Sequence, residues 1–341
     1  MKPPADLPSL RAFFDSIDWV RMEEEVASEA RARLAIVGPV NSGKSTLFNL
    51  LKGQAISEVS AVPGTTQAAV VEHFGPFTLV DTPGLGEALG DERVTKAREE
   101  IGRARLVVLL LDAAAGVRQS DLDLYYSIRA EGIPVIVGLN KVDLVRRDLR
   151  AILNDLSFRL QGTRVVPVSA RTGQGVTDQL IPAIIQANEA AAVVVGRALP
   201  AYRASAAKQV IDTTMWWALL LGAEPIPGLD LPLLLGMQAR MVLRLAAIYG
   251  ENFTARHARE LLTTMAGGLV TRYLALELAK FVPALGWVVS GIIAALGTRA
   301  MGKVAEMYFA SGHRLTAEQL RALYRRLFRR PREAPTLPPS N

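Results

Sequence analysis

One stretch of eight residues has the residue types and spacing of a phosphate-binding loop, the pattern GxxxxGKS. It runs Gly38-Pro39-Val40-Asn41-Ser42-Gly43-Lys44-Ser45. The apolar residues 34–37 before it predict a buried strand, and residues 46–51 after it predict a helix. In such a loop the glycines let several backbone N–H groups point into one concavity, where the helix dipole adds positive potential. The lysine reaches the β- and γ-phosphates of a nucleotide, and the serine hydroxyl ligates Mg²⁺.

Two later segments carry groups suited to the same phosphates and metal. The turn-rich residues 62–66 include Thr65 and Thr66, and a threonine hydroxyl there could complete the Mg²⁺ shell and sense the γ-phosphate. The strand-like residues 78–80 run into Asp81-Thr82-Pro83-Gly84. A carboxylate at that strand end can hold Mg²⁺ through water, and the glycine amide can contact the γ-phosphate and move when it leaves.

A third group of residues predicts recognition of guanine. The apolar residues 134–139 lead into Asn140-Lys141-Val142-Asp143, the NKxD pattern. Guanine presents two adjacent N–H donors that the Asp143 carboxylate can accept, whereas adenine would leave it unpaired, and such a mismatch is worth roughly 10⁴-fold in selectivity. The apolar residues 165–168 then deliver Ser169-Ala170, whose backbone could bind the guanine carbonyl.

These five motifs, in this order, resemble the translation-factor-like branch of P-loop GTPases, and within it the Era and TrmE group. The resemblance covers residues 31–190 and implies an α/β domain with a mostly parallel sheet. It also implies GTP and GDP as ligands, Mg²⁺ as the metal and hydrolysis of GTP to GDP and phosphate. Carried over by position, it assigns nucleotide contacts to Gly38, Asn41, Ser42, Gly43, Lys44, Ser45, Thr46, Gly84, Asn140, Lys141, Asp143, Ser169 and Ala170, and Mg²⁺ contacts to Ser45, Thr66 and Asp81.

The hydrolytic step departs from that of Ras-type GTPases. Those enzymes orient the attacking water with a glutamine after DxxG, and this chain has Leu85 there, so hydrolysis must be slow or take help from elsewhere. Many Era/TrmE-like proteins bind K⁺ through a loop asparagine, which matches Asn41, and the cation replaces an arginine finger. The resemblance thus implies catalytic roles for Lys44, Asn41 and Thr66. A residue that caps the loop is the alternative for Asn41.

The match is weaker in the switch segments. Gln67 stands where TrmE-like proteins usually carry arginine. Glu87 and Glu92 lie in range of the glutamate that holds water in TrmE-like enzymes, but in a shorter segment, so neither is assigned that role. The resemblance also implies stimulation by K⁺ and by a homodimer formed through the switch regions.

Composition divides the 341 residues into four parts: a leader helix (1–30), the GTPase domain (31–190), an all-α apolar domain (191–330) and a disordered proline-rich tail (331–341). The pattern Leu10, Phe13, Phe14, Ile17, Val20 predicts an amphipathic leader helix between Leu7 and Ala32, packed onto the chain after it. The absence of cysteine excludes disulfides, thiol nucleophiles and cysteine zinc sites. Residues 201–341 carry 17 Lys and Arg against 9 Asp and Glu, so an anionic partner would meet that half.

Two interpretations of the C-terminal half stay open. Its Pro-Ile-Pro-Gly-Leu-Asp segment at 225–230 and glycine-rich apolar helices resemble an uncharacterised helical domain fused behind Era-like GTPase domains in bacteria. Residues 281–298 carry no formal charge, and as a helix they span about 27 Å, just under the ~30 Å hydrocarbon core of a bilayer. Residues 213–239 are also apolar, but Glu224, Asp230 and three prolines interrupt them. The half is either a buried core, soluble or peripheral, or a helical hairpin inserted in the inner membrane.

The last helix is predicted by a capping box, Thr316 with Gln319. One face is apolar, with Leu320, Leu323, Tyr324, Leu327 and Phe328, and the rest carries Arg321, Arg325, Arg326, Arg329 and Arg330. Such a helix either docks by its apolar stripe with solvated arginines or binds an anionic membrane surface or RNA.

The sequence therefore predicts a cytoplasmic, nucleotide-dependent switch that hydrolyses GTP, with the helical half as its effector domain at or near the membrane. The alternative is an RNA-directed GTPase in ribosome assembly or tRNA modification, by analogy with Era and TrmE. A third interpretation, a scaffold that binds GTP without hydrolysing it, is permitted by Leu85.

Overall fold

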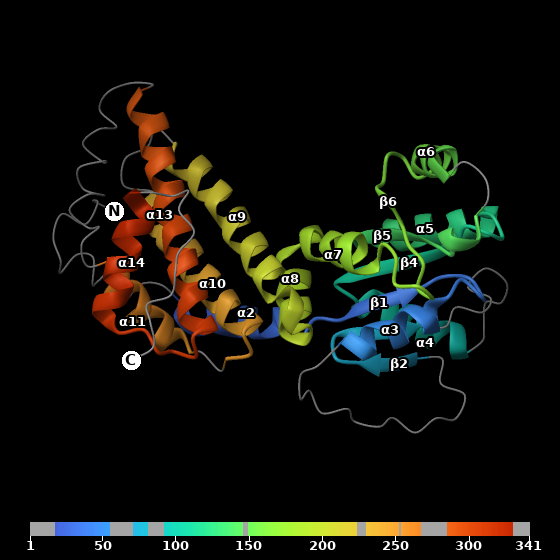
Figure 1. The fold of residues 1–341 in the computed structure, drawn as a ribbon, viewed down its shortest axis with the longest axis horizontal. Helices are drawn as coiled ribbons and strands as arrows, with labels where there is room; N and C mark the ends of the chain where they lie inside the picture. The colour runs from blue at the N-terminus through green and yellow to red at the C-terminus, as the bar shows by residue number, and fades with distance from the viewer. Residues whose placement is uncertain are drawn as a thin grey trace. The chain divides into compact units, whose positions relative to one another are not determined.

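A computed structural model describes residues 18–54, 71–80, 92–145, 149–223, 230–251, 254–266 and 285–329. The chain forms two compact units (Figure 1). One contains residues 31–205, and the other joins residues 1–30 to residues 206–341. The first unit is an α/β domain and the second is helical, as the sequence predicts.

The α/β unit is built on a six-stranded sheet in the order β2-β3-β1-β4-β5-β6. Only the β2–β3 pair is antiparallel, so the predicted mostly parallel sheet is confirmed. The strands are β1 (Leu34–Val37), β2 (Val71–Phe74), β3 (Phe77–Val80), β4 (Leu106–Asp112), β5 (Val135–Asn140) and β6 (Val165–Pro167). Because parallel strands end at one edge of the sheet, the loops after β1, β4, β5 and β6 lie together there.

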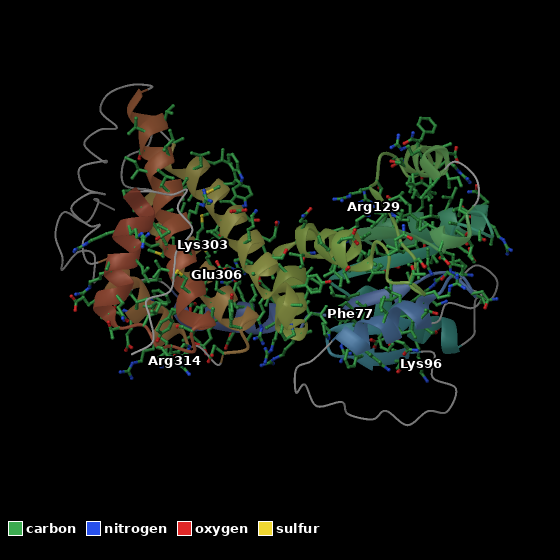
Figure 2. The ribbon with its side chains drawn as sticks, viewed as in Figure 1. Phe77, Lys96, Arg129, Lys303, Glu306 and Arg314 are labelled. Atoms are coloured by element: carbon green, nitrogen blue, oxygen red, sulfur yellow. The ribbon has the colours of Figure 1, made fainter. Side chains whose placement is uncertain are left out.

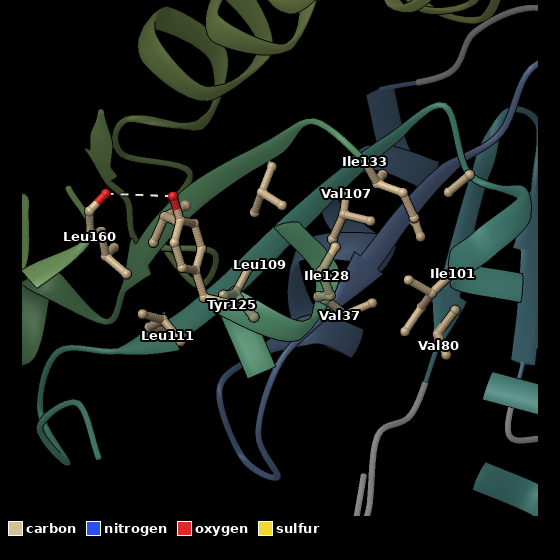
Figure 3. Close-up of a cluster of buried hydrophobic side chains, with 14 of the residues drawn as sticks. Val37, Val80, Ile101, Val107, Leu109, Leu111, Tyr125, Ile128, Ile133 and Leu160 are labelled. Atoms are coloured by element: carbon tan, nitrogen blue, oxygen red, sulfur yellow. Dashed lines mark hydrogen bonds between the residues drawn. The ribbon is translucent and has the colours of Figure 1, made fainter. Parts of the chain in front are cut away.

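The helices of this unit bury their apolar faces on the sheet. They are α3 (Lys44–Gln54), α4 (Glu92–Arg103), α5 (Gln119–Ala130), α6 (Leu149–Arg159), α7 (Ile181–Ala187) and α8 (Glu189–Ala198), with short turns η1 (Val142–Leu144), η2 (Val176–Leu180) and η3 (Pro200–Tyr202). Figure 3 shows the core between the strands and α5, where Tyr125 is buried and donates a hydrogen bond to the Leu160 carbonyl at 3.5 Å. This packed sheet is the rigid base of the loops at its edge.

The helical unit contains α2 (Trp19–Glu29), most of α9 (Arg203–Gly222), α10 (Asp230–Ile248), α11 (Ala255–Ala266), α13 (Leu285–Ala310) and α14 (Ala317–Arg329). Within it α10 packs against α13, α11 and α2. Helices α9 and α13 approach so closely that a Cβ on Gly291 would lie 2.6 Å from the Leu219 carbonyl oxygen. Small residues let helix backbones approach in this way in either water or lipid.

The described part of the leader helix is α2, and its partners come from the far end of the sequence, since it packs on α10 and α11. The Glu29 carboxylate accepts hydrogen bonds from Arg244 at 2.7 and 2.8 Å and from Arg240 at 3.3 Å. Arg240 also pairs with Glu25 at 2.8 Å, and Arg244 is only 8% exposed. This ion-pair cluster comprises Glu25, Glu29, Arg240 and Arg244. It fixes α2 along the C-terminal half of α10. Leu10, Phe13, Phe14 and Ile17 lie outside the described residues.

The predicted capping box of α14 is present. The Thr316 amide donates to Gln319 Oε1 at 2.9 Å, and the Gln319 amide donates to Thr316 Oγ1 at 3.3 Å. The apolar stripe is buried and the helix packs on α13 and α11, which confirms the docked interpretation. Arg321, Arg325 and Arg326 face solvent. The tail after Arg329 lies outside the described residues.

Among the described residues, one helical segment is long and apolar enough to cross a membrane, Val288–Ala310, with a mean hydropathy of 1.3. In this segment 61% of the apolar window is buried, and core helices of soluble proteins have a similar length and hydropathy. The C-terminal half of this segment carries an ion pair between Lys303 and Glu306 at 2.7 Å (Figure 2). Residues 224–229 and 281–284 of the two predicted apolar windows lie outside the described residues.

Glu29→Gln should destabilise the helical unit by about 3–5 kcal/mol, because it removes the carboxylate charge that the buried Arg244 guanidinium contacts at 2.7 and 2.8 Å. All four tryptophans of the chain belong to this unit, so tryptophan fluorescence during urea unfolding reports on it alone.

Glu260→Gln is the matched control, since Glu260 pairs with Arg256 on the exposed face of α11 at 3.0 Å. It should shift the unfolding free energy by about 0.5 kcal/mol or less. Equal effects of the two changes would contradict the assigned role of the ion-pair cluster.

Candidate functional site

The loop between β1 and α3 requires both of its glycines. Gly38 has φ +150°, and a Cβ there would lie 2.2 Å from the Leu110 carbonyl oxygen on β4. Gly43 has φ +94°, and a Cβ there would lie 2.1 Å from the Asn140 side-chain nitrogen. Any larger residue at either position would push the loop away from the strand ends beside it.

Lys44 is buried under this loop. Its ammonium group donates hydrogen bonds to the carbonyls of Gly38 at 2.9 Å and Pro39 at 3.0 Å, so the loop curls around the charge. Ser45 and Thr46 follow in the first turn of α3, both exposed. The loop thus brings a lysine ammonium, a hydroxyl and a helix N-terminus together, which is an arrangement that binds phosphate.

Asn41 is exposed and has φ +64°, in the left-handed region. Asparagine tolerates this conformation better than most residues with a side chain. The loop therefore has a conformational use for Asn41 apart from any ligand, in line with the capping alternative, and its exposed amide is also accessible to a cation. Ser42, next to it, is fully buried.

Asn140 joins the phosphate loop to the loop after β6. Its side-chain nitrogen donates to the Ser42 carbonyl at 2.7 Å, and its side-chain oxygen accepts from the Ala170 amide at 2.8 Å. The residue is 2% exposed, so both ends of the amide are satisfied within the protein. A guanine carbonyl at the Ala170 amide would share that donor with Asn140.

Lys141 is held by a residue that the sequence did not single out. It has φ +65°, and its ammonium group pairs with Asp112 at 2.5 Å. Asp112 ends β4 and is the register partner of Asn140, and it also accepts from the amides of Ala114 at 2.9 Å and Ala115 at 3.1 Å. Burial raises the pKa of Asp112, but the bond from Lys141 and those two amides outweigh it and lower that pKa below its usual value.

Asp143, the predicted base-binding carboxylate, lies at the same edge of the sheet. It accepts a hydrogen bond from Arg171 at 2.6 Å, and Arg171 is itself 71% exposed. A hydrogen bond with the Ser169 side chain, and then Arg171, lower the pKa of Asp143 although desolvation opposes them. The carboxylate is therefore ionised at neutral pH with both oxygens as acceptors. Arg171 was not predicted, because its position directly after Ser169-Ala170 gives no sign that it reaches Asp143.

The loop that carries Ser169 is tightly turned. The Ser169 amide donates to the Gln174 carbonyl and the Gly173 amide donates to the Ser169 carbonyl, both at 2.8 Å. Gly175 has φ +72°, and a Cβ there would lie 2.2 Å from the Pro167 carbonyl oxygen. These contacts fix the Ser169-Ala170 backbone beside Asn140.

The structure thus brings together the phosphate-loop residues and the base-side residues of the prediction. The switch and metal residues are not described: Thr65, Thr66, Gln67, Asp81, Gly84, Leu85 and Glu87 lie outside the described residues. Glu92 begins α4, but its side chain is outside them as well. The metal ligands Thr66 and Asp81 stay predictions.

Two family models match separate segments of the chain. Residues 33–141 match the model described as "50S ribosome-binding GTPase". Residues 185–333 match the model described as "Domain of unknown function (DUF697)". The first segment runs from β1 to the end of β5, and the second from α7 past α14.

Relatives match about half of the chain. A "GTPase Der" of Syntrophobacter fumaroxidans is 37% identical over 177 residues, 47% of this chain and 40% of the relative. A "tRNA modification GTPase MnmE" of Moorella thermoacetica is 34% identical over 184 residues, 51% of this chain and 39% of the relative. The chain therefore spans about two fifths of the length of these relatives.

Among solved structures, the crystal structure of Era in complex with MgGDPNP and nucleotides 1506–1542 of 16S ribosomal RNA is 29% identical. It covers 46% of this chain and 56% of that chain with a TM-score of 0.36, which is too low to support an argument.

Asn140→Ala should destabilise the α/β unit by about 1–3 kcal/mol, because the Ser42 carbonyl and the Ala170 amide both lose their partner. Thermal unfolding followed by far-ultraviolet circular dichroism measures the effect, and tryptophan fluorescence, which reports the helical unit, should not change. Asn49→Ala, an exposed position on α3, is the control and should have little effect. Equal melting of the two variants would show that Asn140 is not a structural bridge.

Proposed function

We propose that this chain, in which residues 33–141 are part of a P-loop GTPase domain, binds GTP with Mg²⁺ and hydrolyses it to GDP and phosphate. The observation that carries the proposal is the double hydrogen bond of Asn140, at 2.7 Å to the phosphate loop and 2.8 Å to the loop after β6. That side chain holds the phosphate loop next to the Ser169-Ala170 backbone, so the proposed phosphate-binding and base-binding segments lie side by side, as a nucleotide requires.

On the phosphate side, Lys44 would exchange its bonds to Gly38 and Pro39 for the β- and γ-phosphates. The residues present fit Mg²⁺ in one respect, since the exposed Ser45 hydroxyl at the start of α3 is the hard oxygen ligand that this ion prefers. Thr66 and Asp81 are proposed to complete the shell. When bound, the metal would neutralise charge that develops on the transferred phosphoryl group.

On the base side, Asp143 would accept the two N–H donors of guanine. Arg171 occupies that carboxylate in the described structure, so the base has to displace an exposed and therefore weakly held guanidinium. Asp112 holds the Lys141 ammonium, which fixes the course of that side chain at the end of β5.

We further propose that the cycle of GTP binding and hydrolysis switches the helical unit, which acts as the effector at or near the cytoplasmic face of a membrane. An RNA-directed activity is the competing proposal. It draws on the name of one relative, which mentions tRNA modification. We place it second because the matched relatives cover only about half of this chain.

Asp143→Asn should lower GTP affinity and raise the affinity for xanthosine triphosphate, since an amide can donate to the xanthine carbonyl but no longer accepts both guanine donors. The change in preference should approach about 10⁴-fold. Titration with fluorescent GDP and xanthosine diphosphate measures it.

Asp155→Asn is the matched control. Asp155 also pairs with an arginine, Arg159, at 3.8 Å on the exposed face of α6, and its replacement should leave both affinities unchanged. Unchanged GDP affinity in Asp143→Asn would remove the base-recognition role.

Replacing KCl by NaCl should slow GTP hydrolysis by at least about tenfold if K⁺ serves in place of an arginine finger. Asn41→Gly separates the two interpretations of Asn41, because glycine adopts the same φ of +64° without a ligand amide. The variant should bind GDP as before and hydrolyse GTP at one rate in both salts. A variant that keeps the K⁺ preference would show that Asn41 serves the loop conformation alone.

A further inference from the structure

Large apolar side chains are exposed at one set of helix ends in the helical unit. They are Trp216, Trp217 and Leu220 near the end of α9, Leu233 near the start of α10, and Val288, Val289 and Ile292 near the start of α13. Both tryptophans are 60% exposed. We call these seven residues the apolar tip. A soluble surface normally scatters such residues singly, so a group of seven needs an explanation.

The three helix ends lie at the same end of the unit. Ala218, Leu234 and Ala294 pack in one buried cluster, which places the end of α9 beside the beginnings of α10 and α13. One turn further in, Gln238 on α10 donates to Thr298 on α13 at 2.9 Å. Helix α13 extends past the end of α9 (Figure 1). The apolar tip is therefore one contiguous region of the unit.

Charged residues begin at a common level on all three helices. A Cβ on Gly302 would meet Ile211 at 2.7 Å and Met241 at 3.0 Å, so these three positions share a layer. Asp212 directly follows Ile211, Arg240 directly precedes Met241, and Arg299 lies three residues before Gly302. From it to the tip, residues 213–223, 231–239 and 285–298 carry no charged side chain. Among the described residues of these helix ends, the exception is Asp230, the first residue of α10.

The uncharged lengths match one leaflet of a bilayer. At 1.5 Å per residue, the uncharged ends of α9 and α10 are about 15 Å long and that of α13 is about 21 Å. Half of the ~30 Å hydrocarbon core is about 15 Å. Trp216 and Trp217 lie about one turn beyond Asp212, at the depth where tryptophans gather between headgroups and acyl chains.

We propose that the apolar tip inserts into one leaflet of a lipid bilayer, with Asp212, Arg240 and Arg299 at the level of the headgroups. This inference depends on the proposed function in one respect only, namely that the inserted tip would be the contact through which the helical unit acts as effector. Apart from Asp230, the charges of the three helices end at one level, as insertion into a planar bilayer requires and contact with a protein partner does not. We limit the proposal to one leaflet, because the described uncharged part of α13 is about 21 Å long against a core of ~30 Å and the Lys303–Glu306 pair follows it.

The test uses the full chain with vesicles of phosphatidylcholine alone and of phosphatidylcholine mixed with phosphatidylglycerol. The chain should sediment with both, because insertion is driven by apolar burial rather than by charge. Lipids brominated along the acyl chain should quench its tryptophan fluorescence. The variant Trp216→Ser/Leu220→Ser should reduce vesicle partition at least about tenfold. Both side chains are exposed, so the fold should be kept, which far-ultraviolet circular dichroism checks.

Phe158→Ser is the matched control, because Phe158 is the most exposed large apolar residue among those described, at 84%, and lies on α6 of the α/β unit. It should leave vesicle partition unchanged. Sedimentation only with the anionic vesicles, lost at high salt, would assign binding to surface arginines and overturn the proposal. A tip variant that changes the oligomeric state without changing vesicle partition would also overturn it, in favour of a second copy of the chain.

GTP hydrolysis measured on the same samples separates bilayer insertion from the proposed GTPase function. The tip variant should hydrolyse GTP at the rate of the unmodified chain when no vesicles are present. Vesicle insertion without any GTP hydrolysis would sink the proposed function and leave the apolar tip standing.

Discussion

The candidate nucleotide site depends on one buried amide. Asn140 is the register partner of Asp112 across β4 and β5, and it bonds a carbonyl 98 residues before it and an amide 30 residues after it. An aspartate could not donate to the first, and a longer glutamine would not keep both distances. An apolar residue would leave two buried polar groups unpaired. The spacing between the phosphate loop and the base-side loops is thus set by a single side chain, which the parallel sheet holds from below.

The α/β half could be predicted from the sequence because its information is local. Each motif follows an apolar run, and the parallel sheet that such runs form brings their carboxyl ends together. Asp112 and Arg171 could not be predicted, because their roles are ion pairs across 29 and 28 residues of sequence. Asp112 directly follows the apolar run 106–111, which is compatible with its place at the end of a strand, but nothing in the sequence indicates its bond to Lys141.

The helical half shows the same division. The capping box of α14 spans four residues and was predicted, and the docked stripe was one of the two interpretations that the sequence left open. The partner of α2 was not, since Glu29 meets Arg244 across 215 residues and an amphipathic pattern does not identify the surface that covers it. Exposure at the ends of α9 and α13 was also hidden in the sequence, because a buried apolar helix and an exposed one have the same composition.

The ion-pair cluster and the apolar tip divide α10 into two parts with opposite needs. A buried arginine is stable only beside a counter-charge, so Arg244, with the partly exposed Arg240 beside it, fixes where α2 must lie along the C-terminal half of the helix. Residues 231–239, in the N-terminal half of α10, carry no charged side chain, so no ion pair fixes the position of another helix along them. Helix α2 ends at Glu29, and β1, which leads into the phosphate loop, begins at Leu34. A short link therefore leads from α2, which is held by the charged part of α10, into the strand that precedes the phosphate loop, whereas the uncharged part of α10 has no such tie to α2.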